Sequence, residues 1–228
     1  MPLSIHALTP TEFVAAAPLL VDVYLHAMKY PARLRESRIA AWEQDSTLPG
    51  FRAFCALHTP VLSPPRASRT QVAPSEPAGA SPSAPRTPPI HQADPAHIAG
   101  VVYGFHGSAD TWWHQQVQRG LLYRHHSATL LDDYFEVTEV HVAPAYQGRG
   151  VGRNLLARLL DGLPEPTALL STPEVPGEAN RAFRLYRSFG FRDVLRSFYF
   201  PGDSRPFAVL GAPLPLASPL PARESPTG

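Results

Sequence analysis

The chain has 228 residues, of which 44% are hydrophobic, and this is enough to build one globular domain with a core. Its formal net charge is +1, with Lys29 the only lysine, so charge does not indicate a nucleic-acid or membrane partner. The single cysteine, Cys55, excludes an intramolecular disulfide and fits a reducing, cytoplasmic compartment. No basic region precedes the first apolar stretch, and no run reaches the ~18 apolar residues of a membrane span, so we expect no signal peptide or transmembrane helix.

The first 58 residues predict two strands that enclose two helices. Residues 3–8 alternate between apolar and polar side chains, as a half-buried strand does. Thr9 is suited to cap a helix, because Pro10 favours the first helical position and Glu12 completes a capping box. The expected elements are a strand, two helices and a second strand: 3–8, 9–30, 32–44 and 51–58.

A proline-rich segment follows, and its composition differs from that of the preceding residues. Ten prolines fall from Pro60 to Pro95, among Ser, Ala, Thr, Arg and Gln. Such a segment buries too little apolar surface to offset its conformational entropy. We therefore expect one domain over 1–212 with a disordered insertion at 59–96, and a flexible tail at 213–228. A proline-rich docking segment for a partner protein is the alternative interpretation of the insertion.

Beyond the insertion, strands and helices alternate to the end of the domain. The pattern predicts strands at 97–107, 134–142, 167–171, 191–200 and 207–211, and helices at 112–124, 150–160 and 177–188. Together with the first four elements, this order predicts an α/β fold in which one mixed sheet carries helices on its faces.

The most informative stretch joins the strand at 134–142 to the helix at 150–160 and reads VHVAPAYQGRGVGR. Its alternating glycines let the backbone approach a ligand, and the helix N-terminus offers free N–H groups and the positive end of the helix dipole. The glycines and the arginines beside them are Gly148, Gly150, Gly152, Arg149 and Arg153. We interpret the loop as an anion site suited to a pyrophosphate, although a tight strand-to-helix turn would also explain the glycines.

Two nucleotide-binding loops compete for this interpretation. A dinucleotide fold requires Gly-x-Gly-x-x-Gly near the start of a βαβ unit and an acid about 20 residues on. Here the spacing is Gly-x-Gly-x-Gly, and although Glu174 lies at a suitable distance, too little chain remains for a doubly wound sheet. A Walker loop is excluded because the chain contains no Gly-Lys-Ser/Thr.

The stretch from Val140 to Arg153 closely resembles the acyl-CoA signature of the GNAT acetyltransferases. The segment AFRLYRSFGF, from Ala182 to Phe191, resembles the second signature of that family. The resemblance covers most of the chain and implies the GNAT acyl-CoA N-acyltransferase fold, a central mixed, mostly antiparallel sheet flanked by helices. It implies acetyl-CoA as co-substrate, no metal, and transfer of the acetyl group to a primary amine of a small-molecule or peptide acceptor.

The resemblance also implies roles for individual residues. The loop would wrap the CoA pyrophosphate through backbone amides, and the strand before it would hold the pantetheine arm and the thioester carbonyl. The implied cofactor-binding residues are Val140, His141, Val142, Gln147, Gly148, Arg149, Gly150, Val151, Gly152, Arg153 and Asn180. Tyr186 corresponds to the tyrosine that protonates the leaving thiolate, although its place in the apolar stripe of its helix is also typical of a core residue.

Three carboxylates are candidates for the general base that deprotonates the amine. Strict alternation along the strand at 134–142 places Glu136 on one face and Glu139, with His141, on the other. By resemblance, Glu136 stands where some GNAT enzymes carry the base, and Glu139 is an equal alternative. Glu174 corresponds to the base position of ribosomal-protein acetyltransferases and ranks third. Each acid has an alternative role as a solvated or ion-paired side chain.

The acceptor side is less specified by the sequence. Trp112, Trp113 and Tyr134 are expected to shape the acceptor pocket, because this region borders it in GNAT folds. Arginines recur on one side of the helix at 177–188, where they are either a solvated face or contacts for a CoA phosphate. Acceptor pockets are built by variable loops, so the sequence does not identify the amine.

Two other functions remain open. A GNAT-like protein that binds CoA without transferring an acyl group would act as a sensor or interaction module, because a cofactor loop can persist without chemistry. A nucleotide-binding oxidoreductase is the third hypothesis. By analogy with the family, a homodimer through the C-terminal strands is also expected as a possible assembly.

Overall fold

The computed structural model describes residues 3–58, 90 and 94–216, so the predicted insertion at 59–96 lies largely outside the described residues, as does most of the predicted tail. The described ranges contain these strands and α-helices: β1 Leu3–Leu8, α1 Pro10–Met28, α2 Arg35–Asp45, β2 Arg52–His58, β3 Ile98–His106, α3 Trp112–Tyr123, β4 Phe135–Val142, α4 Val151–Leu160, β5 Thr167–Pro173, α5 Arg181–Ser188, β6 Arg192–Phe198 and β7 Phe207–Pro213. All the elements expected from the sequence are therefore present in the expected order.

Local sequence explains where the helices begin. The capping box of α1 is confirmed, because the Thr9 hydroxyl accepts from the Glu12 backbone N–H and a Glu12 carboxylate oxygen accepts from the Thr9 N–H. The prediction that the last helix starts at Gly177 is wrong. Gly177 has a φ of +60°, and α5 starts only after Asn180, whose side chain caps it by accepting from the Phe183 N–H at 2.8 Å.

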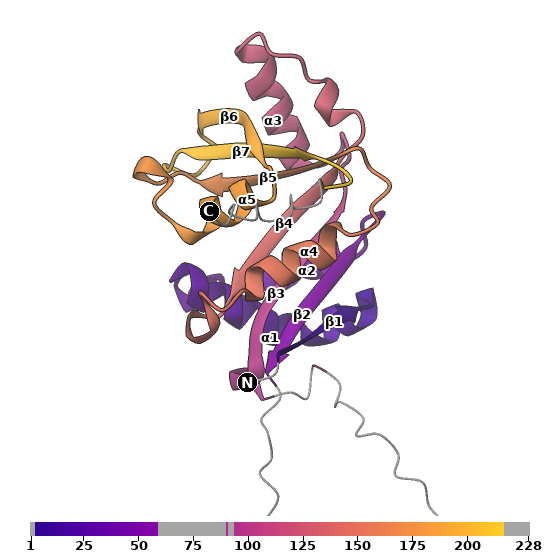
Figure 1. The fold of residues 1–228 in the computed structure, drawn as a ribbon, viewed down its shortest axis with the longest axis vertical. Coiled ribbons are helices and arrows are strands. Elements are labelled where there is room, and N and C mark those ends of the chain that lie inside the picture. The colour runs from indigo at the N-terminus through magenta and orange to yellow at the C-terminus, as the bar shows by residue number, and fades with distance from the viewer. Residues whose placement is uncertain (1–2, 59–89, 91–93, 217–228) are drawn as a thin grey trace, which may run out of the picture.

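The strands form one sheet in the order β1-β2-β3-β4-β5-β7-β6. All neighbouring strands are antiparallel except β4 and β5, which run parallel. This parallel pair is joined at only two positions near the start of β4, Phe135 with Ala168 and Glu136 with Leu169. Figure 1 shows the consequence: β4 crosses the molecule obliquely while β5 and β7 take another direction, so the sheet is split in its middle.

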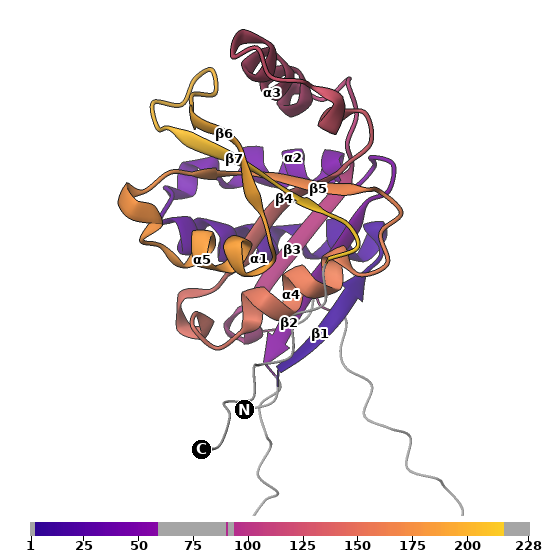
Figure 2. The same cartoon turned by 45° about the horizontal axis from the view of Figure 1, so that its top comes forward.

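Helices cover both faces of the sheet. One face packs on α1 and α2 through a cluster that includes Phe13, Trp42 and Tyr103, and α3 covers the β5–β7 end of the same face (Figure 2). The other face packs on α4 and α5. Within the described residues, α1 is the one helix long and apolar enough to cross a membrane, but much of it is buried in this core.

The strict alternation expected along β4 is wrong beyond Val137. A β-bulge shifts the register between β3 and β4, so that Gly104 pairs with Val137 and Tyr103 with Glu139, leaving Thr138 as the extra residue. The bulge reverses the faces of the residues that follow. Glu139 therefore shares the α1/α2 face with Glu136 instead of opposing it.

Candidate functional site

A cleft with a volume of about 490 Å³ lies where β4 ends and α4 begins. Its wall combines the end of β4, the glycine-rich loop, the start of α4, one side of α5 and the C-terminal end of α1. The lining residues are Ala27, Met28, Val140, His141, Val142, Tyr146, Gln147, Gly148, Gly150, Val151, Gly152, Arg153, Arg181, Ala182, Arg184, Leu185, Tyr186 and Ser188. Most of the residues predicted to bind the cofactor thus meet in one cavity with Tyr186.

The glycines of the loop hold a backbone that other residues disfavour. Gly148 and Gly150 both have a φ of +79°, in the left-handed region. A Cβ added at Gly150 would have no heavy atom within 4 Å, so the space above this residue is open. Gly150 is also the N-cap of α4 and supplies no side chain, which leaves the first N–H groups of the helix free for a ligand.

Side chains fix the loop and surround it with positive charge. Gln147 donates its amide to the Val142 carbonyl at 3.1 Å and accepts from the Arg181 guanidinium at 2.9 Å. Arg149 stacks 5.8 Å from the ring centroid of Tyr146, whose hydroxyl donates to the Ala96 carbonyl. The cations that line or border the cleft are Arg149, Arg153, Arg181 and Arg184. This donor set fits a phosphorylated ligand such as the pyrophosphate of CoA.

The splayed strand supplies backbone groups beside the cleft. Beyond Glu136 no residue of β4 pairs with β5, so among the described strands the β5-facing edge of Val140 and its neighbours carries no ladder hydrogen bonds. Neighbouring β3 approaches β4 closely at Gly100, where a Cβ would lie 2.7 Å from the His141 carbonyl oxygen. The strand edge can therefore hydrogen-bond an extended polar ligand.

Tyr186 takes part both in the core and in the cleft. Its ring lies 5.9 Å from that of Phe191 and it is 8% exposed, while it also lines the cleft. Burial raises its pKa, and the charge of Glu139 raises it further, so the phenol keeps its proton at neutral pH. The two roles that the sequence left open for Tyr186 are thus compatible.

The two acids of β4 differ in environment. Glu136 is 5% exposed, and its Oε2 has no hydrogen-bond partner within the described ranges. Burial, followed by the charge of Asp45, raises the pKa of Glu136 to about 8. Glu139 is more open, and its Oε2 lies 2.5 Å from Nε2 of His141.

Asp45 of α2 is an acid near this site that the sequence did not single out. It accepts the Tyr103 hydroxyl at 2.8 Å, and burial, with a further contribution from Glu139, raises its pKa to about 6. It lies far along the chain from β4 and in no motif, so only the packing of α2 on the sheet brings it here.

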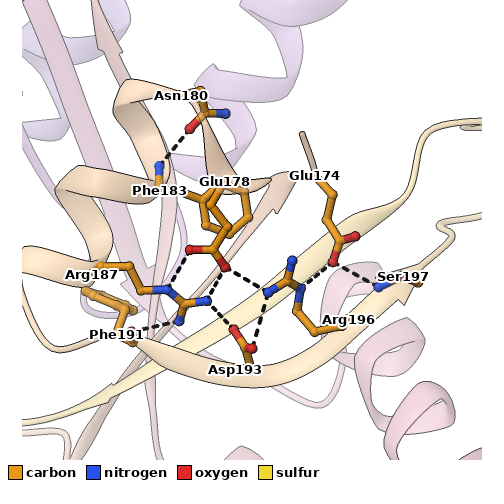
Figure 3. A network of polar contacts seen from close by, with 9 residues as sticks. All are labelled: Glu174, Glu178, Asn180, Phe183, Arg187, Phe191, Asp193, Arg196 and Ser197. Atoms are coloured by element: carbon orange, nitrogen blue, oxygen red, sulfur yellow. Dashed lines mark hydrogen bonds and ion pairs between the residues drawn. The ribbon is translucent and has the colours of Figure 1, made fainter. Parts of the chain in front are cut away.

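Glu174 lies elsewhere, in the ion-pair network of Figure 3. It accepts from the Arg196 guanidinium at 2.5 Å and from the Ser197 N–H at 3.0 Å. Burial alone would raise the pKa of Glu174, but these two hydrogen bonds together hold it below its usual value. Glu174 does not line the cleft, and Asn180 in the same view caps α5 instead of lining the cleft.

The three aromatic residues expected at the acceptor pocket lie around α3 and do not line the cleft. Tyr134 is fully buried, and its hydroxyl lies 3.2 Å from Nδ1 of His114. Trp113 donates its indole N–H to the Ser171 hydroxyl at 3.0 Å. Trp112 is 53% exposed and packs against Phe200.

Comparisons with known proteins agree with this geometry. A family model described as an acetyltransferase (GNAT) domain matches residues 100–193. A GCN5-like protein acetyltransferase of Mycobacterium tuberculosis is 38% identical over 213 residues, which are 92% of this chain and 97% of the relative. Similar folds occur in the ribosomal-protein-S18-alanine N-acetyltransferase of Escherichia coli, with a TM-score of 0.51, 16% identity and coverage of 95% of this chain and 97% of that one. The structure of NAA60 of Arabidopsis thaliana in complex with acetyl-CoA has a TM-score of 0.50 and 14% identity, and the match covers 93% of this chain and 99% of that one.

Proposed function

The chain belongs to the GNAT family of acetyltransferases, and we propose that it transfers an acetyl group from acetyl-CoA to a primary amine of a peptide or protein. The observation that carries the proposal is one cleft that joins the uncapped start of α4, a free strand edge and Tyr186. The relative named as a protein acetyltransferase supports a protein acceptor over a small molecule.

The chain's own groups bind the co-substrate by its chemistry. The N–H groups of Val151 and Gly152 and the cations Arg153, Arg181 and Arg184 would meet the phosphates. The free edge of β4 would hydrogen-bond the amide groups of the pantetheine arm and polarise the thioester carbonyl. The open space above Gly150 leaves room for a phosphate against the loop backbone.

The transfer also needs proton movements. An ammonium group must lose one proton to attack, and Glu136 or Glu139 of β4 would accept it. The nitrogen–carbon bond forms as the carbon–sulfur bond breaks, and Tyr186, which keeps its proton at neutral pH, would donate it to the departing sulfur and recover one from the acetylated nitrogen. The products are the acetylated amine and free CoA, and the first amine proton passes from the carboxylate to water.

Calorimetric titration with acetyl-CoA tests the binding half of the proposal. Gly150→Glu places a carboxylate in the open space of the loop, where it repels phosphate, and should weaken binding by about 100-fold or more. Gly162→Glu is the matched control, because Gly162 also has a positive φ and open space but lies after α4, away from the cleft. Equal affinity of all three proteins would refute the assignment of the loop.

Release of CoA thiol in the presence of peptide amines tests the transfer half. A thiol-reactive dye suits the assay because the single cysteine, Cys55, is buried. Peptides with a free N-terminus and peptides with an internal lysine separate the two kinds of protein amine. Tight binding of acetyl-CoA without turnover of any amine would favour a CoA-binding sensor over an enzyme.

A further inference from the structure

The side chain of His141 makes a contact that backbone binding of a co-substrate does not require. Its Nε2 lies 2.5 Å from Oε2 of Glu139, two residues earlier on β4. Because Glu139 and His141 are two residues apart on a strand, their side chains lie on the same face of the sheet. The bulge at Thr138 turns both side chains toward α1 and α2. The pair is largely enclosed, with 8% of the His141 side chain and 16% of the Glu139 side chain exposed.

The imidazole ring is fixed on two further sides. The ring of Tyr24 from α1 meets it edge-on, with centroids 4.8 Å apart at 76°, and the indole of Trp42 from α2 stacks on it at 6.5 Å and 15°. A ring held between two aromatic groups loses little additional entropy when it holds a carboxylate. The Glu139 carboxylate is therefore held by a rigid donor.

This pair also lies beside the place where the transfer would occur. His141 lines the cleft together with Val140 and Tyr186. The charge of Glu139 acts on the Tyr186 hydroxyl strongly enough to contribute to its raised pKa. Neither Glu136 nor Glu139 lines the cleft itself, but Glu139 is joined to it through the contact with His141, whereas Glu136 has no such link. A pKa of about 8 also leaves Glu136 mostly protonated at neutral pH. The contact with His141 and the protonation of Glu136 both favour Glu139 as the proton acceptor.

We propose that His141 is a positioning residue that orients the Glu139 carboxylate to accept the proton of the attacking amine. This inference rests on the acetyl transfer proposed above. Nε2–H of His141 donates to Oε2 of Glu139, and the amine proton passes to the other carboxylate oxygen, Oε1. Oε1 has no hydrogen bond to the protein within the described part of the chain. The proton then leaves to water, while Tyr186 protonates the departing CoA sulfur and recovers a proton from the acetylated nitrogen.

The test compares kcat and KM for the full chain and five variants, with acetyl-CoA and the best peptide amine. Glu139→Gln should lower kcat by about 100-fold to 10,000-fold, which is the usual contribution of a general base. His141→Ala should lower kcat by roughly 10-fold to 100-fold through misplacement of the carboxylate.

His141→Gln and the double variant separate positioning from mere structural support. The glutamine amide can still donate to Glu139, so this variant should recover most of kcat. In the Glu139→Gln background, His141→Ala should cost less than about twofold more, because a residue that acts through Glu139 has nothing left to orient. Circular dichroism melts and calorimetric affinity for acetyl-CoA verify that each variant is folded and binds.

Several outcomes overturn the inference. They are a His141→Gln variant as slow as the His141→Ala variant, and additive losses in the double variant. A Glu136→Gln variant that abolishes turnover while Glu139→Gln does not would also overturn it. If the wild type binds acetyl-CoA but acetylates no amine, the proposed transfer fails and this inference with it, whereas any of the other outcomes leaves the transfer intact.

Discussion

Replacing Glu136 with glutamine should make the protein more stable at pH 8 than the wild type, by a difference that grows as pH rises from 4.5 to about 8. The Glu136 carboxyl is buried without a partner for Oε2 within the described residues, and its pKa is raised from 4.5 to about 8. Between these two pH values the folded chain keeps a proton on Glu136 that the unfolded chain has released, so rising pH favours unfolding. Glutamine has nearly the same shape and no charge to bury.

The size of the effect follows from the width of that interval. The difference between 4.5 and about 8 is about 3.5 pH units, and each unit corresponds to about 1.4 kcal/mol. The wild type should therefore lose up to about 5 kcal/mol relative to Glu136→Gln, all of it between about pH 4.5 and about pH 8. Asp45, with its pKa raised to about 6, gives a slope of the same sign in both proteins and largely cancels in the difference.

Urea denaturation followed by tryptophan fluorescence, from about pH 5 to about pH 9, measures this difference. Glu174→Gln is the matched control, since hydrogen bonds keep the pKa of Glu174 below its usual value. The ionised Glu174 carboxylate loses its stabilising contribution only at pH values below those measured. The difference in unfolding free energy between Glu174→Gln and the wild type should therefore not change across the measured pH range. A Glu136→Gln difference that is equally flat would refute the reasoning.

Two further predictions concern the site and the bulge. Tyr186→Phe should lower kcat by about 100-fold or more while the calorimetric affinity for acetyl-CoA stays within about twofold, because only the hydroxyl is removed; an unchanged kcat would leave Tyr186 a core residue. Gly104→Ala should lower the urea-measured stability by roughly 1–3 kcal/mol, because its Cβ would collide with the Glu136 carbonyl. Gly152→Ala, whose Cβ would lie 3.4 Å from Leu185, is the control with little expected loss.

The order of the elements follows from the sequence because each has a local signal. The capping box at Thr9 and the apolar stripe of α4 are readable without tertiary information. The sequence predicts too early a start for α5 because a short 3-10 turn at Pro176–Glu178 precedes the helix. Helical periodicity alone does not distinguish such a turn from the first turn of an α-helix.

The site was predictable where chemistry resides in contiguous residues and not where packing creates it. The glycine-rich loop could be predicted from the spacing of its glycines and from the helix that follows it. The neighbourhood of Asp45, Glu139 and His141 depends on how α2 packs on the sheet, which no motif encodes. Glu174 matched a base position by sequence, but Arg196 from β6 holds it in an ion pair outside the cleft.

One irregularity of β4 links these observations. Gly104 pairs with Val137 at the bulge, and only a residue without Cβ lets β3 approach the Glu136 carbonyl there. The bulge turns Glu139 to the side of Glu136, toward the helices that hold His141, and β4 stops pairing with β5 at the same level. The position of Glu139, the proposed proton acceptor, and the free strand edge therefore arise together. A substitution that removed the bulge would displace both Glu139 and the strand edge. A substitution of Glu139 alone, or of the glycine-rich loop alone, would not displace both.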